Sequence, residues 1–65
     1  MHNKTMVGEI INYVDNNRFT NESALICNKI LGNTDRIDDE VVNELHARLG
    51  RAKIDVIQSC YKLIK

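Results

Sequence analysis

Residues 38–65 read DDEVVNELHARLGRAKIDVIQSCYKLIK, and this C-terminal stretch decides the expected fold. Its apolar residues recur at alternating steps of three and four, and the one polar interruption, Ser59, lies beside Cys60. Such spacing is typical of the a/d seam of a packed helix. We predict that this seam is an interface for a second copy of the chain or for another partner. The expected interface residues are Val42, Leu45, Leu49, Ala52, Val56, Cys60 and Leu63.

The charges at the two ends of this stretch also favour a helix. Asp38 can cap the helix, because its carboxylate can accept hydrogen bonds from the free N–H groups of the first turn. Asp39 and Glu40 would follow at the positive end of the helix dipole, and Lys62 and Lys65 would lie at the negative end. The sequence therefore predicts a helix that runs from Asp38 to the last residues.

Gly50 is the weak point of that helix. A glycine inside a helix costs about 1 kcal/mol relative to alanine, and Gly50 could instead end a helix at Leu49. Residues 51–54 contain no turn signal and no new cap, and the apolar spacing passes through Gly50 without a change of phase. We therefore favour one unbroken helix over a helix that ends at Leu49.

An unbroken helix of this length has a consequence for oligomeric state. It would extend over roughly 40 Å at 1.5 Å per residue, whereas a globule of this size has a radius of gyration of about 11 Å. The helix would project beyond its own monomer, and its seam would need a partner. We therefore expect a helical homodimer.

A first helix is expected to run from Thr5, which can cap it, to about Asn16, with residues 1–4 as a flexible tail. Apolar residues between Met6 and Val14 form a stripe with helical spacing. The two asparagines that follow Asp15 can end the helix, because asparagine tolerates the left-handed conformation.

A second helix is expected to begin at Thr20 or Asn21, with Phe19 packed onto it as a hydrophobic staple, and to stop at Gly32. No stretch alternates between apolar and polar residues for long enough to form a strand. The sequence therefore predicts an all-α fold in one small domain, residues 1–65, with two short N-terminal helices and a long C-terminal helix.

The charge balance bears on the class of function. The chain has nine basic and nine acidic residues and no net charge, whereas nucleic-acid binders depend on neutralising phosphates. We therefore predict a protein that acts by protein–protein interaction. The alternative is a small DNA-binding regulator with a helix–turn–helix motif. The second helix of that motif would be the C-terminal one, and it would begin with the acidic residues Asp38, Asp39 and Glu40. Its candidate nucleic-acid contacts are Arg48, Arg51, Lys53 and Lys62.

Catalytic, metal and cofactor sites are not expected. His2 and His46 have no second ligand at a recognised zinc spacing, and the acidic cluster at residues 35–40 lacks the pattern of a calcium loop. Cys27 and Cys60 lie on apolar helical faces, so we expect buried thiols rather than a disulfide. No signal peptide or membrane span is visible, and we expect a cytoplasmic protein.

Two segments resemble the small bacterial YmgB/AriR family of biofilm and acid-stress regulators, which are called two-component connector proteins. They are VGEIINYVDNNRFTNESALICNKIL at residues 7–31 and DRIDDEVVNELHARL at residues 35–49. The shared pattern is a short helix, an asparagine-rich turn, a capped second helix and a longer helix. The resemblance implies a helical homodimer that modulates a signalling or regulatory protein. It implies no catalytic residue.

Overall fold

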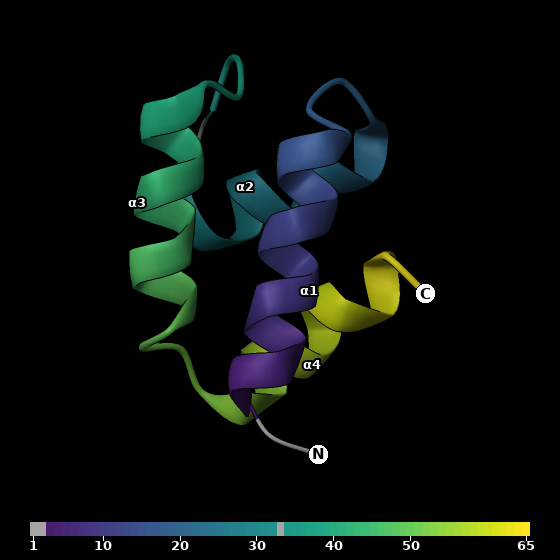
Figure 1. The fold of residues 1–65 in the computed structure, drawn as a ribbon, viewed down its shortest axis with the longest axis vertical. Coiled ribbons are helices and arrows are strands. Elements are labelled where there is room, and N and C mark those ends of the chain that lie inside the picture. The colour runs from purple at the N-terminus through teal and green to yellow at the C-terminus, as the bar shows by residue number, and fades with distance from the viewer. Residues whose placement is uncertain (1–2, 33) are drawn as a thin grey trace.

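The computed structural model of this protein describes residues 3–32 and 34–65, which form four helices (Figure 1). The helices are α1 (Asn3–Asn16), α2 (Asn21–Leu31), α3 (Asp39–Leu49) and α4 (Ile54–Leu63). Within these described ranges there is no strand. The all-α prediction is therefore confirmed, but the prediction of three helices is wrong, because the expected long C-terminal helix is two separate helices.

The first helix, α1, begins at Asn3 rather than at the predicted cap, Thr5, and ends at Asn16 as predicted. Met1 and His2, the first half of the expected tail, lie outside the described residues. The side-chain amide of Asn17 donates a hydrogen bond to the carbonyl of Tyr13 at 2.9 Å, which satisfies one of the free acceptors of the last turn. No described residue except glycine has a positive φ, so this bond replaces the left-handed stop that we expected.

The second helix, α2, begins and ends as the sequence predicts. The hydroxyl oxygen of Thr20 caps it by accepting a hydrogen bond from the N–H of Ser23 at 3.3 Å. Gly32 ends it with φ at 92°, and its N–H donates to the carbonyl of Asn28 at 3.0 Å. The predicted staple is wrong, because the side chain of Phe19 is 99% exposed and does not pack on α2.

The third helix, α3, has the predicted cap. The carboxylate of Asp38 accepts a hydrogen bond from the N–H of Val41 at 2.9 Å. Arg18, in the turn between α1 and α2, lies 2.6 Å from the carboxylate of Asp39 and 2.7 Å from that of Asp15. These charged hydrogen bonds, first to Asp15 and then to Asp39, raise the pKa of Arg18. They also tie the first turn of α3 to the end of α1.

All four helices contribute to a single apolar core. In Figure 1, α1 lies in the middle, with α3 beside it and α4 crossing near its N-terminal end, while α2 packs against α3 and α4. Fully burying a large aliphatic side chain contributes about 1.5–3 kcal/mol to folding, so this core is the main source of stability. Its buried members are Met6, Val7, Ile10, Val14, Ile26, Cys27, Val42, Leu45, Leu49, Ile57 and Cys60.

The predicted long helix is broken between Leu49 and Ile54. After Gly50 the hydrogen bonds tighten, and the N–H groups of Arg51 and Ala52 donate to carbonyls only three residues back, at 3.1 Å each. Lys53 is extended, with ψ at 153°, and α4 starts from it in a new direction. The break favours packing, because it lets the apolar face of α4 turn back onto α1.

The break also moves the buried face of α4 by one residue. The unbroken seam would bury Val56 and Leu63, whereas the structure buries Ile57 and Cys60 and packs Ile64 against the core. Leu63 is 36% exposed. With α1 covering α4, the monomer measures 30 × 21 × 16 Å, and none of the four described helices projects from it. The homodimer prediction, which depended on a projecting seam, therefore loses its support.

A polar cluster joins α4 to α1 at the edge of the core. The hydroxyl of Tyr61 donates a hydrogen bond to the carboxylate of Glu9 at 2.8 Å. The ammonium group of Lys65 lies 3.6 Å from the same carboxylate and 5.2 Å from the centre of the Tyr61 ring. The hydrogen bond to Glu9 and the ion pair connect residues far apart in the sequence, and they hold the end of α4 on α1.

The two glycines that follow α2 and α3 make a matched pair for substitution. We expect Gly32→Ala to lower the free energy of unfolding by about 1–3 kcal/mol, because a Cβ strains the backbone at φ 92°. Gly50 has φ at −63°, and a Cβ there would lie 3.3 Å from the carbonyl oxygen of His46. We expect Gly50→Ala to change stability by less than about 0.5 kcal/mol. Thermal melts would contradict this if Gly50→Ala were the more damaging variant.

Lys53 offers a direct test of the start of α4. It occupies the cap position without a side-chain hydrogen bond, and its positive charge lies at the positive end of the helix dipole. We expect Lys53→Asp to raise the free energy of unfolding by about 1 kcal/mol. Lys62→Asp, the same charge change in the last turn of α4, serves as the control and should lower stability slightly. If chemical denaturation showed that both variants lose stability, Lys53 would not be the cap residue of α4.

Candidate functional site

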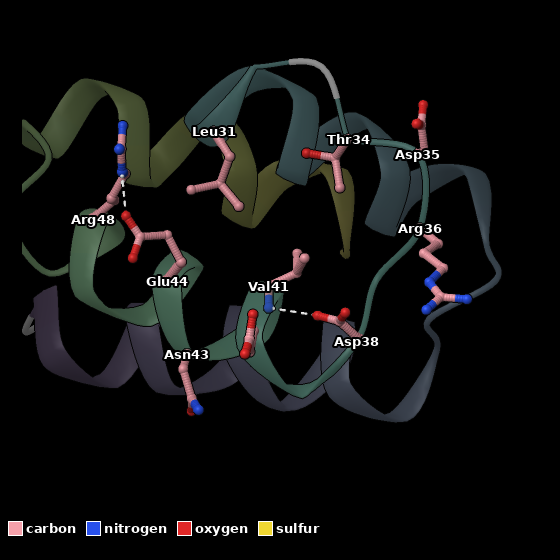
Figure 2. A pocket seen from close by; sticks show the side chains of 10 residues that line it. Leu31, Thr34, Asp35, Arg36, Asp38, Val41, Asn43, Glu44 and Arg48 are labelled. Carbon is pink, nitrogen blue, oxygen red and sulfur yellow. Dashed lines mark hydrogen bonds and ion pairs between the residues drawn. The ribbon is translucent and has the colours of Figure 1, made fainter.

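A hollow of about 980 Å³ lies between the end of α2, the segment that follows it and the first half of α3 (Figure 2). Leu31 from α2 and Val41 from α3 point into it, and both are half-buried side chains packed against the core. Because these apolar side chains are not fully covered by the chain itself, the floor of the hollow can accept another apolar side chain.

The rim of this hollow is acidic, and we name it the acidic hollow. Its lining includes the carboxylates of Asp38, Glu40 and Glu44, all exposed. Asp35 and Arg36 also belong to the lining, but in Figure 2 their side chains point away from the centre. The N-terminal end of α3 supplies most of these charges, where acidic residues also complement the helix dipole.

A second hollow of about 660 Å³ lies where α2, α3 and the start of α4 meet, and we name it the basic hollow. Lys29, Arg48 and Arg51 line it, against a single carboxylate, Glu44. Its apolar lining is Ile30, Ala47, Ala52 and Val56. Each of the three cationic groups is exposed, so an anionic side chain from outside can reach them.

The two hollows adjoin along an ion pair. The guanidinium of Arg48 lies 2.9 Å from the carboxylate of Glu44, one helical turn away on α3. Both residues line both hollows, so the pair forms the boundary between them. Both side chains are more than half exposed, and such a pair contributes little to folding. Its effect is to separate an acidic from a basic half of one continuous surface.

The predicted interface residues lie in different parts of the structure. Val42, Leu45, Leu49 and Cys60 are interior side chains of the monomer. Ala52 and Val56 are half-buried and line the basic hollow. Leu63 is exposed near the end of α4, away from both hollows. Of the predicted seam, only the short part at Ala52 and Val56 therefore lies on the candidate surface.

The predicted nucleic-acid contacts also lie in different parts of the structure. Arg48 and Arg51 line the basic hollow. Lys53 caps the start of α4, Lys62 lies in its last turn, and neither lines a hollow. Sequence reasoning missed Lys29, which joins the two arginines from α2. No local pattern could have shown this, because Lys29 reaches the hollow only through the packing of α2 against α3 and α4.

The described residues contain no group of three or more His, Cys, Asp or Glu side chains that could hold a metal ion. His46 is exposed and lies beside a separate groove with Lys4, Val7 and Gly8, and His2 lies outside the described residues. Among the described helices, none is long and apolar enough to cross a membrane.

The two cysteines are free thiols inside the core, as predicted. Burial is the main cause that raises the pKa of both Cys27 and Cys60, and the proximity of Cys60 raises that of Cys27 further. The positive charge of Lys29 lowers the pKa of Cys60, but by less than burial raises it. Both groups are therefore neutral, poorly nucleophilic side chains at neutral pH.

No family model, curated protein or solved structure matches this chain. The likeness to the YmgB/AriR family therefore stays a prediction.

The buried thiols give a pH dependence with a definite sign. Their pKa is higher in the folded chain than in the unfolded chain, where a thiol titrates near about 8.5. Their contribution to stability is therefore complete below the unfolded pKa and is lost as the pH rises toward the folded pKa. We expect the free energy of unfolding to fall above about pH 8.5 in urea melts. The Cys27→Ala/Cys60→Ala variant should be less stable at pH 7 but should lose less stability between pH 7 and 9.5; equal losses would contradict this account.

Proposed function

We propose that this protein is a small regulatory protein that acts by binding another protein, as an adaptor, connector or inhibitor. The observation that supports this best is the pair of adjoining hollows, in which half-covered apolar side chains lie between exposed charged groups. An apolar centre with a polar rim is the usual anatomy of a protein–protein interface. The proposal needs no catalytic residue and no cofactor.

The resemblance to the connector family supports the same class of function. On that basis we extend the proposal to a cytoplasmic regulator from a bacterium or phage, with a role in stress response or biofilm control. The two resembling segments, residues 7–31 and 35–49, include α2 and α3, which carry most of both hollows.

DNA binding is the second candidate, and one observation favours it. Lys29, Arg48 and Arg51 come together in the basic hollow from two helices and a turn. Against it, Arg48 already pairs with Glu44, and α3 starts from acidic residues that phosphates would repel. The chain has no net charge. Any binding to DNA would therefore depend on a few phosphate contacts and would be weak at physiological salt.

A comparison of two charge reversals distinguishes these functions. Arg51→Glu changes a side chain of the basic hollow, and Lys62→Glu makes the same change in charge on α4, outside both hollows. We expect a protein partner captured from nuclease-treated host lysate to be retained by the natural chain and by Lys62→Glu. The amount of this partner that is captured, measured by quantitative mass spectrometry, should be about tenfold lower with Arg51→Glu.

Two outcomes would contradict the proposal. One is capture that is equal for all three proteins. The other is capture from untreated lysate that is lost after nuclease treatment, together with a gel shift on duplex DNA that both reversals weaken alike, which would favour the DNA-binding alternative.

A further inference from the structure

We propose that the acidic and basic hollows together bind a single amphipathic helix of the partner protein, with basic residues toward one end and acidic residues toward the other. This inference rests on the proposed function, since it names the partner element that the same surface would hold. The acidic end of the partner helix would lie over Lys29 and Arg51, and its basic end over Asp38 and Glu40.

The two hollows adjoin. Both are lined by Glu44 and Arg48, so one partner segment can contact both of them. From Asp38, at one end, to Arg51, at the other, the chain follows α3 for about 20 Å at 1.5 Å per residue. A partner helix of about 13 residues would cover this distance, which is an ordinary helix length in globular proteins.

The shape of the surface favours a helical partner. The described residues contain no strand, so an extended peptide has no sheet edge there to which it could add. The surface lies instead between packed helices, with Leu31 and Val41 in one hollow and Ile30 and Val56 in the other. Helices bind such grooves by placing an apolar stripe at i, i+3, i+4 and i+7 against them.

The charges of the two hollows are opposite in sign. Acidic residues at the start of α3 and basic residues at its end are partly explained by the helix dipole. The basic hollow is not a property of α3 alone, however, because Lys29 comes from α2 and Arg51 follows the end of α3. Separate segments thus place charges of one sign together, and a partner with the opposite order of charges would meet favourable contacts along its whole length.

The Glu44–Arg48 pair adds a constraint at the middle. It lies on the boundary of the two hollows and already satisfies both of its charges. A charged partner side chain at that point would be repelled by one member of the pair and attracted by the other, so its charge would gain little. The central turn of the partner helix therefore carries small or uncharged residues.

Synthetic peptides of the chosen pattern provide the test. The sorted peptide is a 14-residue helix held by a side-chain staple on its outer face, with a leucine stripe, glutamates in one half and lysines in the other. The comparison peptide has the same composition and stripe, with the two charges interleaved. By fluorescence anisotropy at low salt, we expect the full-length protein to bind the sorted peptide at least fivefold more tightly than the interleaved one. Equal affinity, or no binding of the sorted peptide at millimolar concentration, would overturn the inference.

Variants of the protein locate the two ends of the bound peptide. Glu40→Lys in the acidic hollow and Arg51→Glu in the basic hollow should each weaken binding of the sorted peptide about threefold. Reversing the facing charges of the peptide should restore the affinity for each variant. Lys62→Glu, the control, should leave it unchanged. Loss of binding without rescue, or equal loss in the control, would place the peptide elsewhere.

The outcomes separate this inference from the proposed function. If a captured partner depends on Arg51 but the sorted peptide has no advantage, the protein binds other proteins and the charge-sorted helix is wrong. If the sorted peptide binds as expected but no lysate protein depends on Arg51, the surface has the inferred preference and the proposed function fails. Crosslinking of a captured partner to an Asn43→Cys variant, at the edge of the acidic hollow, should identify a helix with sorted charges. A crosslinked segment without that pattern would overturn the inference.

Discussion

The packing of α4 against α1 is the interaction on which the rest of this structure depends. Ile57 and Cys60 are inside the core because the chain changes direction between Leu49 and Ile54 (Figure 1). Burial of an aliphatic side chain such as Ile57 contributes about 1.5–3 kcal/mol, which exceeds what one continued helical turn through a glycine would add. The contact of Tyr61 with Glu9 then holds the far end of α4 in place. A small chain thereby completes its own core.

The same packing decides which surface remains available to a partner. Because α4 turns toward α1, it leaves the outer side of α3 and the end of α2 uncovered. Leu31, Val41 and Val56 are therefore only half-buried. Both hollows follow from this arrangement, since each lies beside a helix junction whose outer side no other described element covers.

The polar groups near this surface have different roles. The carboxylate of Asp38 caps α3, and that of Asp39 pairs with Arg18 in the turn before α2. These bonds fix the position of the first turn of α3 and so shape the acidic hollow. Lys29 and Arg51 are exposed and line the basic hollow. Glu44 and Arg48 bind each other and divide the surface into its two halves.

Local chemistry in the sequence was sufficient for part of this structure. The caps at Thr20 and Asp38 and the stop at Gly32 were predicted correctly, because each depends on a few neighbouring backbone groups. The all-α class and the buried thiols followed from helical periodicity.

Tertiary structure alone decided the break after Leu49, the exposure of Phe19 and the place of Lys29 in the basic hollow. The apolar pattern could not show the break, because Val56 and Ile57, like Leu63 and Ile64, are adjacent apolar residues. Either member of each pair can face a core. The choice was made by α1, which is distant in sequence and offers α4 an apolar face that no local rule takes into account.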